Sequence, residues 1–230
     1  MPQPLKKWDA KIRFDPESLA QRPKLAIKIA QVAAAWTNLE VHIGFLLADI
    51  MQSKADVGVT MYLALSGSAA QEAVFTAVAE KYVPGKHMEK LAALLKTIRK
   101  RAKERNAIIH ATWSLHPDDE AALINCPPQS VILEMGHMIS HFKTHGETST
   151  TYEHSLAGVM IYKEQDFEDL LARFKEVRKA IDEFKADFEK FREELFQHIR
   201  ELGDAAAKAL GIAHQDKPQE TPPKSPEHGQ

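Results

Sequence analysis

Residues 105–110 of this chain, with the sequence Arg-Asn-Ala-Ile-Ile-His, bring together three side chains that suit chemistry on a phosphate ester. Arginine carries a permanent, planar cation that matches phosphate oxygens, and histidine can give or take a proton near neutral pH. An asparagine can hold a ribose, a phosphate or the imidazole by hydrogen bonds. By composition alone, the Arg-Asn-x-x-x-His spacing is expected only about 0.006 times in this chain. Arg105, Asn106 and His110 are therefore candidate residues for binding or cleaving a phosphodiester.

A run of basic residues precedes this motif. Six of the ten residues from 96 to 105 are Lys or Arg, and only Glu104 opposes them. On a helix, Arg99 and Lys103 share a face with the later residues of the motif, because the spacings are three or four residues. We expect Arg99, Arg101 and Lys103 to attract nucleic acid. The alternative is a basic helix end that compensates the helix macrodipole and binds no ligand.

Glu40 is a candidate supporting residue for the motif. It flanks an apolar stripe between Trp36 and Ile43, so its carboxylate is expected close to the interior. There it could pair with Arg105 and hold the guanidinium in place. The alternative is a carboxylate at the rim that reaches water.

Three histidines, His137, His141 and His145, are spaced four residues apart. In a helix, adjacent members could chelate a metal, but the outer two would lie about 12 Å apart along the axis and could not share one ion. We expect surface histidines in an irregular segment. The sequence thus predicts no metal site and no cofactor.

The elements that must position these residues are mostly helical. Apolar residues recur every three or four positions over residues 25–50, 91–109 and 167–202, and a shorter helical stretch covers 67–82. The motif lies near the end of the third of these helices. A long helix with one apolar seam cannot bury that seam alone. We therefore predict a mainly all-α fold, an antiparallel bundle of four to five helices, and a homodimer.

The pattern changes between residues 116 and 162, where turn signals and β-branched residues alternate. This segment predicts a small insertion of short β-strands or a hairpin before the long C-terminal helix. Residues 1–23 are expected to form an irregular arm and residues 24–205 the bundle domain. The polar, Pro-rich residues 206–230 are expected to be disordered.

Composition restricts the classes of function. The chain has 230 residues and a formal net charge of −2, which argues against a protein that coats polyanions but leaves room for a local basic patch. It has no run of eighteen apolar residues, so we expect no membrane span. Cys126 is the single cysteine, which rules out an internal disulfide and a cysteine-built zinc site. The first nine residues lack the apolar core of a signal peptide, and we expect a cytoplasmic protein.

The segment from Arg105 to Trp113 resembles the signature of HEPN domains, the higher-eukaryote and prokaryote nucleotide-binding superfamily. Their shared mark is Arg, a polar residue that is often Asn, three further residues and His near the end of a late helix in a bundle. The tryptophan after the histidine and the closing helix, opened here by residues 161–167, are similar to those of bacterial members. The resemblance covers roughly residues 24–202.

This resemblance implies a metal-independent endoribonuclease that acts as a homodimer, with the Arg and His of both subunits in one cleft. His110 would act as general base or acid on the ribose 2′-hydroxyl, Arg105 would stabilise charge on the phosphoryl oxygens, and Asn106 would help to orient the pair. Many such proteins are toxins or anti-phage effectors, some with an antitoxin partner. Two alternatives stay open: a module that binds RNA or nucleotide without cleaving it, and a structural helical-bundle adaptor.

Overall fold

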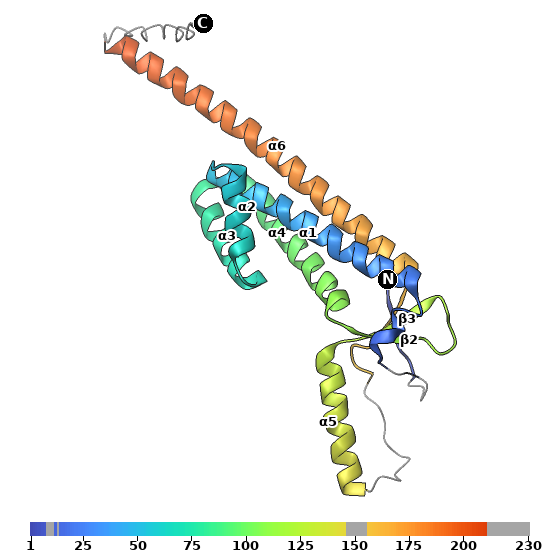
Figure 1. Ribbon diagram of the computed structural model, residues 1–230. Helices are drawn as coiled ribbons and strands as arrows, with labels where there is room; N and C mark the ends of the chain where they lie inside the picture. The colour runs from blue at the N-terminus through green and yellow to red at the C-terminus, as the bar shows by residue number, and fades with distance from the viewer. Residues whose placement is uncertain (8–11, 13, 146–155, 211–230) are drawn as a thin grey trace, which may run out of the picture. The chain divides into compact units, whose positions relative to one another are not determined.

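The computed structural model describes residues 1–7, 12, 14–145 and 156–210 (Figure 1). Its helices are α1 (Pro23–Met51), α2 (Ala55–Ala64), α3 (Ser68–Tyr82), α4 (Gly85–Ile109), α5 (Pro128–His145) and α6 (Glu164–Ala209), with a short 3₁₀ turn at Pro16–Ser18. Its strands are β1 (Gln3–Pro4), β2 (Thr112–Leu115), β3 (Ala122–Cys126) and β4 (Met160–Lys163). The prediction of a mainly helical fold with a small β element is confirmed.

The chain divides into two compact units. The first runs from Met1 to Lys185, and the second begins at Ala186 within α6. In the second unit, Phe188 and Phe191 stack, and the side chains further along the helix at Leu195, Ile199 and Leu202 are exposed. The helix continues beyond Gly203 to Ala209, so its end lies later than expected. Most of the predicted disordered tail, residues 211–230, lies outside the described residues.

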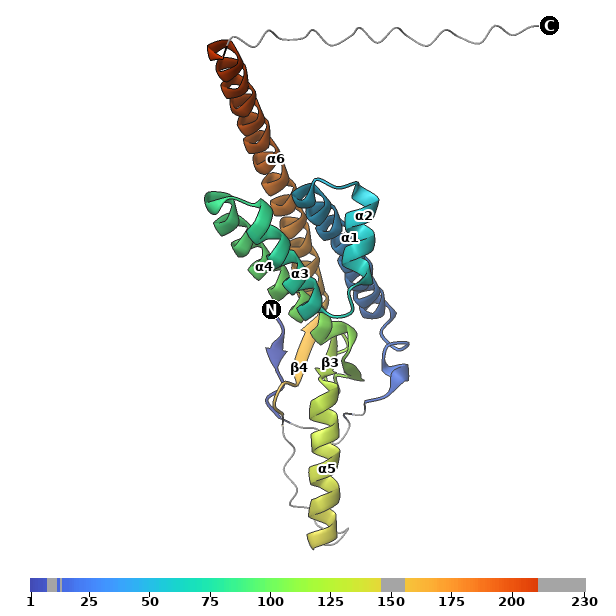
Figure 2. The same cartoon turned by 90° about the vertical axis from the view of Figure 1, so that its left-hand side faces the viewer.

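α1 is the central helix of the first unit. Pro23 stands at its first position, where a missing N–H costs no hydrogen bond, and Gln52 ends it in the left-handed conformation with φ of 54°. The predicted stripe is buried along the helix at Leu25, Val32, Trp36, Leu39, Ile43, Leu46 and Ile50. Figures 1 and 2 show α1, α2, α3 and α4 grouped together.

The close packing of α1 on α2 depends on two glycines. A Cβ atom added at Gly44 would lie 2.8 Å from the Cα of Val59, and one added at Gly58 would lie 2.7 Å from the Cα of Ala48. Carbon atoms prefer separations of about 3.5–4.0 Å, so only glycine permits this approach. α2 was not predicted from the sequence, and this contact holds it against α1.

α1 and the first part of α6 run in the same direction. Lys28 bonds Glu168 near the start of both helices, and Asp49 pairs with Lys185 further along. Between them, the rings of Trp36 and Phe174 meet edge to face, 5.4 Å apart. Figure 1 shows α4 running in the opposite direction to α1. The antiparallel prediction is therefore wrong for α1 and α6, because both helices start from the end of the unit that carries the sheet.

The four strands form one antiparallel sheet in the order β1-β4-β3-β2. β2 and β3 make the predicted hairpin, with Trp113 opposite Asn125. β1 comes from the expected irregular arm, where Leu5 and Ile12 are buried in a cluster with Ile124, Cys126 and Val159. The arm is thus part of the fold, since its apolar side chains complete the core beneath the sheet.

Residues 128–145 form a helix, which corrects the expectation of an irregular segment. Pro128 opens α5, because proline suits the first turn of a helix as well as a loop. His137, His141 and His145 therefore lie on one helix at four-residue spacing.

Within the described residues, no group of three or more His, Cys, Asp or Glu side chains is placed to hold a metal ion. No described helix is long and apolar enough to cross a membrane.

Candidate functional site

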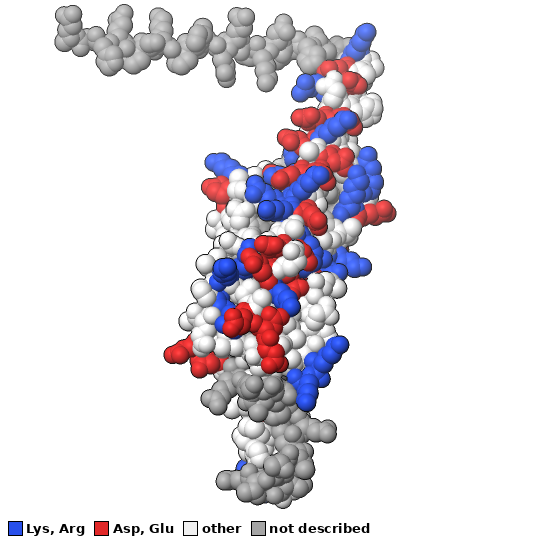
Figure 3. Space-filling view, turned by 90° about the vertical axis from the view of Figure 1, so that its right-hand side faces the viewer, with Lys and Arg blue, Asp and Glu red and all other residues white. Residues whose placement is uncertain are grey.

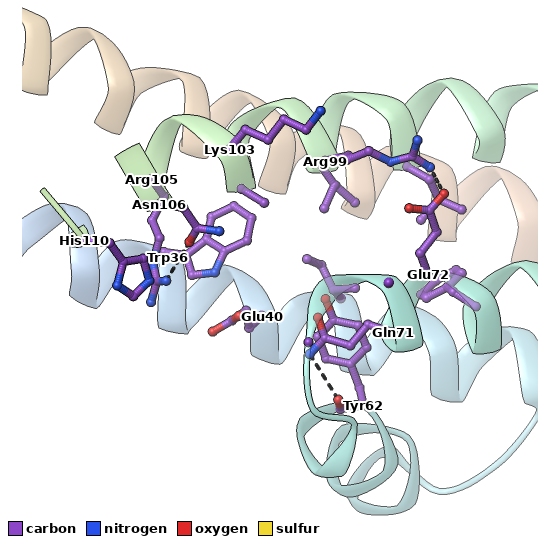
Figure 4. Close-up of a pocket in the computed structure, with 17 residues that line it drawn as sticks. Trp36, Glu40, Tyr62, Gln71, Glu72, Arg99, Lys103, Arg105, Asn106 and His110 are labelled. Carbon is purple, nitrogen blue, oxygen red and sulfur yellow. Dashed lines mark hydrogen bonds and ion pairs between the residues drawn. The ribbon is translucent and has the colours of Figure 1, made fainter. Parts of the chain in front are cut away.

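A pocket of about 440 Å³ lies within the first unit between α1, α2, α3 and α4 (Figure 4). Most of the candidate residues predicted from the sequence line it, namely Arg99, Lys103, Arg105, Asn106, His110 and Glu40. Its other walls come from the buried side chains of Trp36, Ile43, Tyr62, Phe75 and Ile98 and from polar Gln71 and Glu72. The motif and the predicted support residue therefore meet at one cavity.

The end of α4 determines where the motif lies. Ile109 is the last residue of the helix, and the backbone N–H of His110 donates to the carbonyl of Asn106 at 3.1 Å. The side-chain amide of buried Asn125 on β3 donates to the carbonyl of Ala107 at 3.0 Å. Because this bond links the helix end to the sheet, the exposed imidazole of His110 projects from a rigid support.

Arg105 interrupts the apolar stripe of α4 and lies half-buried at the pocket. Its Nη1 donates to Oδ1 of Asn106 at 2.9 Å, so the asparagine orients the guanidinium (Figure 4). Its Nε is buried and has no hydrogen-bond partner within the described residues. A buried N–H without a partner is costly, and an anionic ligand would supply one.

Arg101 does not belong to this site. It is buried on another face of α4, where its Nη1 bonds the carboxylate of Glu104. Glu104 also pairs with Arg173 of α6, with 3.5 Å between the oxygen and Nε. The prediction that Arg101 attracts nucleic acid is therefore wrong, since its charge is neutralised inside the structure.

The other two predicted basic residues, Arg99 and Lys103, both line the pocket, but they differ in their surroundings. Arg99 forms an ion pair with Glu72 of α3, while Lys103 is exposed beside it (Figure 4). On the face shown in Figure 3, Lys and Arg side chains are interspersed with Asp and Glu.

Glu40 lies on α1 between the two ends of the pocket. Figure 4 shows it between the Arg105–His110 end and the end formed by Tyr62 and Gln71. The predicted pair with Arg105 is not formed, and within the described residues the Glu40 carboxylate has no ion-pair or hydrogen-bond partner. Burial, and secondly the charge of Glu40, raises the pKa of Tyr62 to about 12.

Sequence reasoning missed the residues that α2 and α3 contribute. Tyr62 is buried in the pocket wall, and its carbonyl accepts a hydrogen bond of 3.3 Å from Nε2 of Gln71. α2 consists almost entirely of small and apolar residues, so no helical period marks which of its side chains faces the core. Nothing in the sequence pairs Tyr62 with Gln71 or with Arg105.

Comparisons of the chain with models of known protein families, with curated proteins and with solved structures found no significant match. Its function must therefore be argued from the residues of the site.

Proposed function

We propose that this protein is a metal-independent endoribonuclease of the HEPN type that acts as a homodimer. The observation that carries the proposal is the meeting of Arg105, Asn106 and His110 at one pocket, with the imidazole exposed and the guanidinium oriented by the asparagine. An adaptor bundle would need none of these features.

The chemistry follows from these side chains. His110 takes the proton of a ribose 2′-hydroxyl, and the 2′-oxygen attacks the adjacent phosphorus. Arg105 stabilises the negative charge that develops on the phosphoryl oxygens, with a donor, Nε, that the described residues leave unused. The bond from phosphorus to the 5′-oxygen breaks, and that oxygen takes a proton from the histidine of the second copy. The products are a 2′,3′-cyclic phosphate and a 5′-hydroxyl.

A direct test is the cleavage of single-stranded RNA in the presence of EDTA. The wild type should produce fragments that end in a 2′,3′-cyclic phosphate, and His110→Ala should abolish them without changing the melting temperature, because the imidazole is exposed. His198→Ala is the matched control, since His198 is an exposed histidine on α6 and follows Arg192 at a similar spacing. Cleavage that survives His110→Ala contradicts the proposal.

The homodimer is tested by sedimentation of the purified protein over a range of concentrations. A chain that remains monomeric at the highest concentration contradicts the two-histidine mechanism.

Such a nuclease would act on the RNA of its own cell, so we also propose a toxin or anti-phage role that requires a trigger or an antitoxin. Expression of the wild type should stop bacterial growth, and expression of His110→Ala should not.

One observation favours a second candidate function, an RNA-binding module without catalysis. Within the described residues of one copy, no side chain or carbonyl hydrogen-bonds the His110 imidazole, whereas a general base usually has an orienting partner. Wild-type protein that binds RNA with strongly salt-dependent affinity, but leaves it intact, supports this alternative.

A further inference from the structure

The inner part of the pocket has a composition that the cleavage of a phosphodiester does not require. Its walls include the buried side chains of Trp36, which lies beside Arg105 and Asn106 in Figure 4, and of Tyr62 and Phe75. Aromatic walls are the surfaces on which nucleobases stack, with an affinity that does not depend on sequence. The volume of about 440 Å³ falls in the range of roughly 300–1,000 Å³ that is typical of small-molecule pockets.

Glu40 adds a specific polar group to these walls. Its carboxylate lies half-buried at the pocket and, within the described residues, makes no ion pair or hydrogen bond. A carboxylate accepts hydrogen bonds through both oxygens and donates none. A ligand with two adjacent N–H donors would satisfy both of its oxygens at once.

The Watson–Crick edges of the four bases differ in this respect. Guanine presents N1–H and the N2 amino group side by side, and both can donate to one carboxylate. Adenine and cytosine each place an amino group beside an acceptor nitrogen, which a carboxylate repels. Uracil places its single N–H between two carbonyls, which a carboxylate also repels.

Gln71 is placed to complete the recognition. One N–H of its side-chain amide is held by the carbonyl of Tyr62 at 3.3 Å, which leaves the other N–H and the amide oxygen available within the described residues. Because guanine carries its O6 acceptor beside N1–H, a carboxylate and an amide N–H together match its edge. Arg105 and His110 lie at the other end of the pocket, beyond Glu40 (Figure 4).

We propose that this pocket is a guanine-binding subsite, in which Glu40 accepts hydrogen bonds from N1–H and the N2 amino group of a guanine in RNA. The base lies against Trp36 and Tyr62, and its phosphate faces Arg105 and Lys103. The orientation toward a scissile phosphate rests on the proposed ribonuclease function, whereas the recognition of the base does not. Glu40 is thus a specificity-determining residue.

The test compares the binding of 5′-mononucleotides to the purified protein by titration calorimetry. GMP should bind at least about tenfold more tightly than AMP, CMP or UMP, because a hydrogen bond to a charged group contributes about 1.5–3 kcal/mol and each 1.4 kcal/mol is a factor of ten. Glu40→Gln should remove this preference. Glu80→Gln, an exposed carboxylate on α3 outside the pocket, should leave it unchanged.

A change in the ligand tests the same contact without any variant. IMP lacks the N2 amino group of GMP and should bind the wild type about tenfold more weakly. Equal affinities for GMP and IMP, or for GMP and the other three nucleotides, overturn the guanine subsite. An RNA oligonucleotide with a single guanosine should compete with GMP, and one without guanosine should not; GMP binding that no RNA displaces overturns the assignment to RNA.

Mapping of the cleavage sites separates this proposal from the ribonuclease. Cleavage without any preference for guanosine, together with unselective nucleotide binding, overturns the subsite and leaves the ribonuclease standing. Selective, Glu40-dependent GMP binding by a protein that cleaves no RNA supports the subsite and contradicts the ribonuclease.

Discussion

Gly58→Ala should destabilise the protein, although alanine is the better helix former. The added Cβ would lie 2.7 Å from the Cα and the backbone nitrogen of Ala48, so α1 and α2 must separate by about 1 Å to restore normal contact. No rotamer change relieves this overlap, because the obstructing atoms are the Cβ and the backbone of Ala48, and alanine has no alternative rotamer.

The magnitude follows from two opposing effects. Replacing glycine by alanine inside a helix gains about 1 kcal/mol. Overpacking against backbone costs about 3 kcal/mol, the upper part of the usual range. The expected net loss is about 2 kcal/mol, which for a chain of this size lowers the melting temperature by about 4–8 °C.

The assay is thermal unfolding followed by circular dichroism, with Gly203→Ala as the matched control. Gly203 is also a helical glycine, but a Cβ added there meets no atom within 4 Å, so this variant should keep or slightly raise the melting temperature. If Gly58→Ala melts at the wild-type temperature or above it, the close contact between α1 and α2 is wrong.

The same variant also tests the link between this contact and the site. Tyr62 lies one helical turn after Gly58 and lines the pocket. A displacement of about 1 Å at a positioning residue can lower activity by about 10²-fold. Gly58→Ala should therefore reduce RNA cleavage well below the temperature at which it unfolds. Full activity in the folded variant would show that the position of Tyr62 does not matter for cleavage.

Further predictions concern charges and the buried thiol. Arg105→Lys should lower kcat/KM for RNA by at least about 10²-fold at unchanged melting temperature. The reason is that an ammonium lacks the planar fork of donors that binds both a phosphate and Asn106. Wild-type kinetics in this variant would contradict the role of the guanidinium. Lys103→Ala should reduce the salt dependence of RNA binding by about one phosphate contact. Arg101→Ala should leave that salt dependence unchanged and lower the free energy of unfolding by about 1 kcal/mol, since it leaves the half-buried Glu104 carboxylate with Arg173 as its weaker partner. Burial, and secondly the charge of Glu134, raises the pKa of Cys126 to about 11. The unfolded thiol ionises first as the pH rises, so the free energy of unfolding should fall above about pH 9, and it should fall less in Cys126→Ala when both are measured by urea denaturation.

Periodicity predicted the long helices well because their sequences separate apolar from polar residues cleanly. Along α1, the buried side chains fall where the steps of three and four residues place them. α2 and α5 were missed for opposite reasons. α2 has almost no polar residues to define a face, and α5 combines a turn-like Pro127–Pro128 pair with several β-branched residues.

Only the part of the candidate site that lies on a single helix, α4, could be predicted as a group from the sequence. Arg105, Asn106 and His110 are close in sequence, so their proximity in space follows from α4 alone. Which residues face them across the cavity depends on how α1, α2 and α3 pack, and local patterns do not encode that packing. The burial of Arg101 shows the same dependence. The sequence places Glu104 one helical turn after it as a possible partner, but it does not show that this face of α4 is buried.

The residues that line the pocket all lie between Trp36 and His110, one uninterrupted stretch of the chain. Translation on the ribosome therefore completes this stretch before β4 and α6 exist. Until Phe174 emerges, the indole of Trp36 lacks the ring that packs against it in the complete chain. A nascent chain released before that point would carry every residue of the site without the helix that closes its core.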